Sequence, residues 1–282
     1  MTMIKDVCVH LDGTAEDDGR LDHGAMIADL FGAHLVGVYT NKIGVMMFPA
    51  TDFGGASAEI LTEMIADSRR AGDGVEKRLR ARCATLPTPM DFRRIDEADY
   101  LLGWAVANLA RSTDLFVMSR PWGPGKAKRW PDLVESALFD GGRAVYLVPP
   151  ESKTARMPKT ILVGWRDSRE ATRVLTEALP FLKRASSVIL AMVDEHGAPD
   201  RFKDVPAAGI VRHLDRHGVK AELRRVSGWT HASDGLLNEA RLCGADLLVM
   251  GGYGHSRFRE WIMGGNSRAI LTECTLPVLM AH

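Results

Sequence analysis

The sequence predicts an α/β protein made of two copies of one unit, each with a five-stranded parallel sheet flanked by helices. Short apolar segments recur in the same order in both halves, segments with helical periodicity separate them, and a proline-rich stretch lies between the halves. Continuous apolar runs that alternate with helices are typical of a parallel sheet that helices cover on both faces.

The internal repeat rests on three matched pairs of segments, in the same order and at offsets of 132 to 154 residues: Lys5–Thr14 with Lys159–Ser168, Asp114–Ser119 with Asp246–Gly251, and Ala144–Val148 with Pro277–Ala281. The stretch Pro149–Pro158 is polar and rich in proline, which is typical of a linker. We therefore expect one domain over residues 1–149 and a second over residues 159–282.

The second half shows the expected elements most clearly. Its apolar runs predict strands at 160–165, 188–193, 219–226, 246–250 and 276–280, and the segments between them predict helices at 169–183, 207–217, 232–243 and 258–273. Ser168 is the expected N-cap of the first helix, and Gly218 is expected to end the second. The first half follows the same plan, but an insertion at 41–56, with an apolar cluster at Met46–Phe48, precedes a long helix from Ser57 to about Cys83.

Composition and charge exclude several classes of protein. The 36 basic residues balance 36 acidic ones, whereas a nucleic-acid binder typically has a basic excess. No apolar run approaches the roughly 18–20 residues of a membrane span, and the N-terminal segment is not typical of a signal peptide. The cysteines are scattered and predict reduced thiols. We therefore expect a cytoplasmic protein that binds neither nucleic acid nor a membrane.

The segment most typical of a ligand site follows the fourth strand of the second half. It carries a series of glycine and small polar residues: Gly251, Gly254, Gly264, Gly265, Asn266 and Ser267. Glycines between a strand and a helix let backbone N–H groups approach a phosphate, and a helix N-terminus adds a partial positive charge. The alternative interpretation is that these glycines only make tight turns.

The glycine pattern, with the helix and strand that follow it, resembles the universal stress protein family, and the resemblance extends over both repeats. It implies two Rossmann-like domains of the adenine nucleotide alpha hydrolase type, paired like a dimer within the chain with the last strands at the junction. It also implies ATP in the second domain, and it leaves room for a homodimer. Together with the residues around this pattern, the expected nucleotide-binding residues are Trp165, Arg166, Asp167, Val193, Met250, Gly251, Gly254, His255, Gly264, Gly265, Asn266 and Ser267.

This chain departs from the family pattern in both halves. Gly265 replaces a Ser or Thr of the pattern, and Arg166 stands where the family has an aspartate, so it either opposes a phosphate or is solvated. The first half keeps Asp12 and the Gly-Thr that follows it, but its loop at 119–131 has prolines and Trp122 in place of glycines. We therefore expect only the second half to bind nucleotide.

Other candidate sites are weaker. The pair His213 and His217 has the spacing of metal ligands but no evident third ligand. The run Asp194–His196 ends the second strand of the second half, where it would bind Mg²⁺ or position a base, but it is equally typical of a polar turn. No nucleophile elbow or Walker lysine is present, so no catalytic residues are expected. The sequence predicts a stress-response accessory protein that binds ATP and acts through protein partners; a nucleotide-free scaffold of the same fold and a slow ATPase are the alternatives.

Overall fold

The computed structural model of the chain describes residues 4–44, 55–122, 131–152, 155–195, 207–252 and 265–282. The elements of the first half are β1 (Asp6–Leu11), α1 (Asp17–Phe31), β2 (His34–Ile43), α2 (Gly55–Cys83), β3 (Met90–Ala98), α3 (Asp99–Arg111), β4 (Leu115–Ser119), α4 (Pro131–Glu135), the π-helical turn η1 (Ser136–Asp140) and β5 (Ala144–Val148). Those of the second half are β6 (Thr160–Gly164), α5 (Arg169–Leu182), β7 (Ser187–Glu195), α6 (Ala207–Arg216), β8 (Ala221–Trp229), α7 (Ala232–Leu242), β9 (Leu247–Gly251), α8 (Gly265–Glu273) and β10 (Val278–Ala281).

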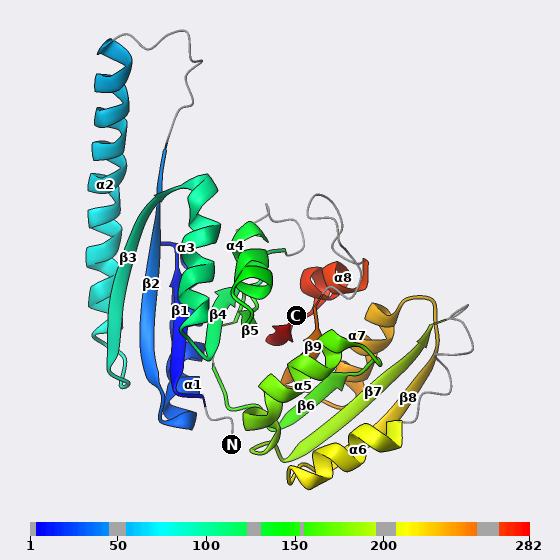
Figure 1. The fold of residues 1–282 in the computed structure, drawn as a ribbon. Coiled ribbons are helices and arrows are strands. Elements are labelled where there is room, and N and C mark those ends of the chain that lie inside the picture. The colour runs from blue at the N-terminus through cyan, green and yellow to red at the C-terminus, as the bar shows by residue number, and fades with distance from the viewer. Residues whose placement is uncertain (1–3, 45–54, 123–130, 153–154, 196–206, 253–264) are drawn as a thin grey trace.

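The described strands form one sheet in the order β3-β2-β1-β4-β5-β10-β9-β6-β7-β8 (Figure 1). The five strands within each half are parallel, and the two halves join where β5 pairs antiparallel with β10. Val278 is opposite Leu147 in that pair, and Met280 is opposite Val145. The expected position of the last strands at the junction is thus confirmed, and the two half-sheets fuse edge to edge into a single sheet.

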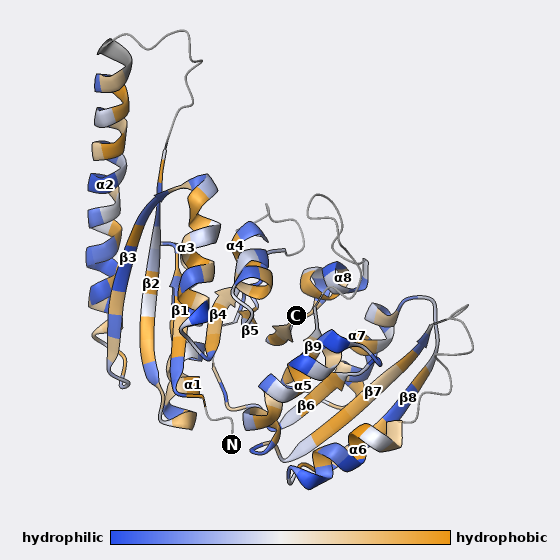
Figure 2. Ribbon diagram, viewed as in Figure 1, coloured by the Kyte–Doolittle hydropathy of each residue, from blue (hydrophilic) through white to orange (hydrophobic). Residues whose placement is uncertain are grey.

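Each face of the sheet buries its own core. Alternate side chains of a strand point to opposite faces, so Val7 and Val9 join the core under α1, α2, α5 and α6, while Cys8 joins the core under α3, α4, α7 and α8. Figure 2 shows that hydrophobic residues concentrate on the central strands. The rings of Phe31 and Phe181 meet edge to face at 5.0 Å, so α1 and α5 also pack against each other across the junction.

The repeated aspartate that precedes the fourth strand has the same structural role in both halves. The Asp114 carboxylate accepts hydrogen bonds from the backbone N–H groups of Lys5 and Asp6, at 2.7 and 3.1 Å. The Asp246 carboxylate accepts from the N–H groups of Lys159 and Thr160, both at 2.9 Å. Each aspartate therefore ties the start of the first strand to the start of the fourth, which explains why the motif recurs.

Most of the expected elements of the second half are confirmed, with differences at their ends. β7 continues two residues beyond its expected end, because Glu195 pairs with Trp229 across a bulge in β8. Gly218 follows α6 with a φ of +80°, as expected for a residue that ends a helix. Residues 258–264 of the helix expected at 258–273 lie outside the described residues, and so does the Met46–Phe48 cluster.

α2 begins at Gly55, and its N-terminal part extends beyond the carboxyl ends of the neighbouring strands (Figure 1). No helix in the described part of the chain combines the length and the apolar character needed to span a lipid bilayer.

Candidate functional site

The candidate nucleotide site lies at the carboxyl ends of the second-half strands. β6 lies between β7 and β9, and Gly164 at its end is in register with Ala191 on one side and Met250 on the other. The strand order therefore reverses between β6 and β9. Open α/β sheets bind ligands at such a switch point, in the crevice outside the carboxyl ends of the strands.

The corner between β6 and α5 contributes exposed polar groups to this edge. The Trp165 N–H donates to the Ala191 carbonyl at 2.8 Å and its side chain is buried in the core, whereas Arg166 and Asp167 are exposed. The Ser168 hydroxyl oxygen accepts from the Ala171 N–H at 3.2 Å, so the expected N-cap is confirmed. The N-terminus of a helix is a common setting for anion binding, because its first N–H groups have no partner within the helix and carry a partial positive charge.

Gly251, where the glycine loop begins, packs directly against the start of α5. A Cβ atom at this position would lie 2.7 Å from the carbonyl carbon of Glu170 and 2.8 Å from the nitrogen of Ala171. A backbone at that distance cannot move aside easily, so the close approach of β9 to α5 itself requires glycine. The same contact brings the start of the loop next to the N-terminus of α5.

Two further residues of the predicted site form its apolar base. Met250 is buried in the core beneath the edge. Val193 is half-buried and packs against α7: a Cβ on Gly235 would lie 2.9 Å from its Cγ1. The structure thus places both side chains in the packing between strands and helices at this edge.

The residues that open α8 also have structural contacts. The Asn266 side-chain oxygen accepts from the Ser233 N–H at 3.3 Å, in the first turn of α7. The N-cap residue of α7, His231, makes no side-chain capping bond of its own, so Asn266 caps α7 from a neighbouring helix. Ser267 is buried, and Gly265 has open space around it. Gly254, His255 and Gly264 lie outside the described residues.

The weaker metal candidates gain no support. The His213 and His217 rings contact each other, with their centroids 4.7 Å apart. Within the described ranges, no group of three or more His, Cys, Asp or Glu side chains is arranged to hold a metal ion. Asp194 is half-buried, and His196 lies outside those ranges.

The corresponding corner of the first half, between β1 and α1, holds a buried network of charges. Arg20 is fully buried, and its Nη2 donates to Asp12 at 2.6 Å and to Asp17 at 2.5 Å. The Asp17 carboxylate also accepts from the N–H groups of Asp12 and Gly13, at 3.0 and 2.8 Å. Asp12 was among the residues singled out in the sequence, whereas Arg20 and Asp17 were not; the available signal was an acidic and a basic residue three positions apart at the start of α1.

His10 extends this network, and its tautomer follows from its partners. Arg20 donates only, so the Nδ1 atom of His10, 3.1 Å from Arg20 Nη1, is the acceptor. The Nε2–H group therefore donates to the Thr40 hydroxyl at 2.8 Å. Burial, together with Arg20, lowers the pKa of His10 to about 3.

The two carboxyl groups of this network titrate in opposite directions. Burial raises the pKa of Asp17 to about 6, against the opposing effect of Arg20. Burial also disfavours the charged form of Asp12, but Arg20, His10 and the Thr14 hydroxyl outweigh it and hold the pKa of Asp12 well below its usual range. Trp122, at the start of the first-half loop, packs half-buried against the core.

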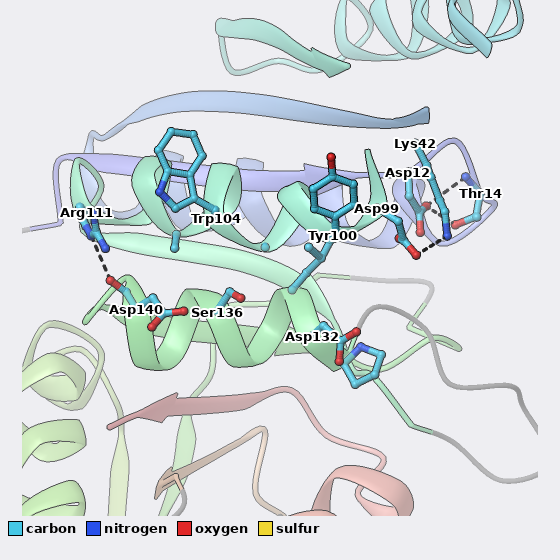
Figure 3. Close-up of a pocket in the computed structure, with 14 residues that line it drawn as sticks. Asp12, Thr14, Lys42, Asp99, Tyr100, Trp104, Arg111, Asp132, Ser136 and Asp140 are labelled. Atoms are coloured by element: carbon cyan, nitrogen blue, oxygen red, sulfur yellow. Dashed lines mark hydrogen bonds and ion pairs between the residues drawn. The ribbon is translucent and has the colours of Figure 1, made fainter. Parts of the chain in front are cut away.

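A groove of about 900 Å³ runs along this edge of the first half, between α3 and the segment α4–η1 (Figure 3). Its lining combines aromatic, acidic and small residues: Asp12, Thr14, Lys42, Asp99, Tyr100, Gly103, Trp104, Ala107, Arg111, Pro131, Asp132, Leu133, Ser136 and Asp140. The sequence did not predict this groove, because its two walls come from segments that are about 30 residues apart.

Comparisons with known proteins agree with this architecture. The model of the universal stress protein family matches residues 157–282. A universal stress protein of Synechocystis sp. is 33% identical over 66 residues, a match that spans 23% of this chain and only 22% of that relative. A crystal structure of a universal stress protein from Archaeoglobus fulgidus covers 98% of this chain, and 97% of its own length, with a TM-score of 0.73 at 13% identity. The structure of a functionally unknown protein from Pseudomonas aeruginosa covers 99% of this chain and 92% of its own, with a TM-score of 0.59 at 14% identity. The second half of the chain thus matches the universal stress protein family, and both halves share the fold of these solved structures.

Proposed function

We propose that this chain is a stress-response accessory protein that binds an adenine nucleotide, ATP, at the carboxyl edge of the second-half sheet and acts through protein partners. The observation that carries the proposal is the corner between β6 and α5. There the exposed Arg166 and the capped N-terminus of α5 lie at the switch point. Gly251, at the end of β9 and the start of the glycine loop, packs against the same end of α5.

The charges at this corner suit an anionic ligand. Arg166 and Arg169 are both exposed, and the helix N-terminus adds a partial positive charge. Asp167 is the exposed carboxylate of the corner, where it would meet a Mg²⁺ ion that arrives with the phosphates. The first half has Asp12 at the position of Arg166, inside a network that contains a second carboxylate. We therefore expect at most one nucleotide per chain.

A nucleotide-free scaffold is the second candidate, and two observations favour it. Gly251 is required by its contact with Glu170 and Ala171, and Asn266 caps α7, so both residues have roles that need no ligand. Under this interpretation the glycine loop is retained for architecture alone, and Arg166 is only a solvated side chain.

Calorimetric titration of the full chain with ATP and Mg²⁺ distinguishes the two candidates. We expect a stoichiometry that approaches one. We also expect at least tenfold weaker binding for Arg166→Glu, equivalent to about 1.4 kcal/mol, because the substitution reverses a charge beside the phosphates. Arg212→Glu reverses an exposed charge on α6 and is the matched control, which should bind ATP like the wild type.

Three outcomes would contradict the proposal. The scaffold interpretation is correct if millimolar ATP with Mg²⁺ neither releases heat nor raises the melting temperature. Two equivalent sites would show that the first half also binds nucleotide. An equal loss of ATP affinity in Arg166→Glu and Arg212→Glu would show that only the net charge of the chain affects ATP binding.

A further inference from the structure

The groove of the first half has an aromatic wall that faces solvent. Tyr100 and Trp104 lie one helical turn apart on α3, and their side chains are 75% and 65% exposed (Figure 3). Soluble proteins seldom leave two large aromatic side chains together in water, and tyrosine and tryptophan are enriched where partners bind. The face of a tryptophan ring also attracts a guanidinium group.

The opposite wall is acidic. Asp132, Ser136 and Asp140 follow one another at intervals of four residues along α4–η1, and Figure 3 shows them along one side of the groove. The lining also contains Asp12 and Asp99, but Asp12 is paired with the buried Arg20 and Asp99 with Lys42, so the acidic character of the groove lies mainly on the wall formed by α4–η1.

The two cations of the lining are both engaged at the ends of the groove. Lys42 pairs with Asp99 at 2.6 Å, and the Arg111 Nε–H donates to the Asp140 carbonyl oxygen at 3.0 Å. Among the residues that the structure describes, Asp132 has no cationic partner. Burial and the neighbouring Asp132 carboxylate raise the pKa of Glu135, so a bound cation would relieve a repulsion that is already present.

A close contact between α3 and η1 at the base of the groove limits how deeply a ligand can enter it. A Cβ on Gly103 would lie 2.6 Å from the Ser136 hydroxyl oxygen, so α3 and η1 are in close contact there. The space is therefore a shallow trough above this contact. From Asp132 to Asp140 it runs roughly 12 Å, at about 1.5 Å per helical residue. Two side chains four residues apart on an extended peptide are separated by about 13 Å and point the same way.

We propose that this trough docks an arginine-rich segment of a partner protein, bound in an extended conformation. Two arginines four residues apart would reach Asp132 and Asp140, and the side chains directly adjacent to them in the sequence, which point to the other side of an extended chain, would face the aromatic wall. Arginine suits the site better than lysine, because its planar group stacks on tryptophan and binds a carboxylate in a bidentate manner. The acidic lining repels phosphates, which argues against nucleic acid or an anionic membrane. This inference concerns the first half and does not depend on nucleotide binding in the second.

A fluorescein-labelled nona-arginine peptide, which presents arginines on both sides of an extended chain, is titrated with the full chain and tests the proposal by fluorescence anisotropy. We expect saturable binding that weakens as salt is added. Trp104→Ala and Asp132→Asn should each weaken it at least tenfold. Leu242→Ala, which removes a side chain 72% exposed on α7, and Asp29→Asn, which neutralises an exposed carboxylate on α1, are the matched controls and should bind within twofold of the wild type.

Peptide variants and competing ligands supply the remaining controls. Replacing the arginines by glutamine should abolish binding, and replacing them by lysine should weaken it. The proposal is wrong if the wild type does not bind the arginine peptide, if the glutamine peptide binds equally well, or if Trp104→Ala and Asp132→Asn bind like the controls. Binding of a single-stranded RNA or of anionic vesicles that depends on Trp104 would also overturn it. ATP titration of the same variants should match the wild type, which separates this test from that of the nucleotide site.

Discussion

The corner between β1 and α1 and the corner between β6 and α5 occupy the same place in the repeat but are built in opposite ways. In the first half, Asp12 is buried and bound to Arg20, which is also buried. In the second half, Arg166 stands at the position of Asp12 and is exposed, as is Asp167 beside it. One fold position thus carries a closed network of paired charges in one half and exposed charged groups of both signs in the other.

This difference indicates how a duplicated unit can divide its roles. The charges of the first corner satisfy one another, so a ligand would have to separate a buried ion pair in order to enter. Among the residues that the structure describes, the exposed Arg166 side chain of the second corner forms no comparable buried ion pair. The first half keeps exposed binding groups elsewhere, on the aromatic and acidic walls of its groove.

The largest expected effect is the loss of Arg20. Arg20→Met leaves the carboxylates of Asp12 and Asp17 buried without their cation, so we expect the free energy of unfolding to fall by about 3–5 kcal/mol. Arg166→Met removes an exposed side chain at the matched corner and should change it by less than about 0.5 kcal/mol. Urea denaturation measures both values. Similar losses in the two variants would show that the corners are not built differently.

The next effect concerns the fourth strand of each half. Gly251→Ala forces a Cβ against the backbone of Glu170, so we expect the free energy of unfolding to fall by about 1–3 kcal/mol. Thermal unfolding without nucleotide measures this change. At the matched position Ser119 donates to the Glu16 carboxylate at 3.0 Å, and Ser119→Gly should cost about 1 kcal/mol. An unchanged stability of Gly251→Ala, combined with weaker ATP binding, would assign Gly251 to the ligand instead of to packing.

The buried histidine makes the stability of the first half depend on pH. Because the pKa of His10 is lowered to about 3 in the folded chain, the unfolded chain binds a proton more readily as the pH falls below about 6.5. This residue therefore contributes stability that is present above pH 6.5 and is lost toward pH 3, about 2 kcal/mol of it between pH 7 and pH 5.

His10→Gln removes this contribution, while its amide can still accept from Arg20 and donate to Thr40. Measured by urea denaturation, the free energy of unfolding should decrease less between pH 7 and pH 5 for the variant than for the wild type. Asp17, whose pKa is raised to about 6, acts in the opposite direction in both proteins, so the difference between them isolates His10. Equal decreases would contradict the assignment.

The smallest effect is expected at the cap of α5. Ser168→Ala removes the acceptor of the Ala171 N–H and should lower the free energy of unfolding by about 1 kcal/mol. Thr14 occupies the matched position in the first half, but its hydroxyl donates to Asp12 instead of capping a helix. Thr172→Ala, an exposed change in the first turn of α5, is the control and should differ from the wild type by less than about 0.5 kcal/mol. A Ser168→Ala chain that unfolds like this control would show that the cap contributes nothing measurable.

The sequence by itself determined the features that depend on local pattern. Periodicity located the strands and helices, and the resemblance to the universal stress protein family predicted β5 and β10 at the junction. Ser168 and Gly218 have the roles that their residue types predict, because a cap or a left-handed residue depends on its immediate neighbours. The strand ends were less certain, since the bulge opposite Glu195 depends on pairing with another strand.

Only the tertiary structure decided the features that depend on distant contacts. Asn266 caps α7 although 33 residues separate it from Ser233, and Gly251 is fixed by the start of α5. Arg20 is stable in the core only because β1 and α1 bring Asp12, Asp17 and His10 around it. A sequence pattern records the type and spacing of residues, but the burial of a charge and the identity of its partner are set by how the elements pack.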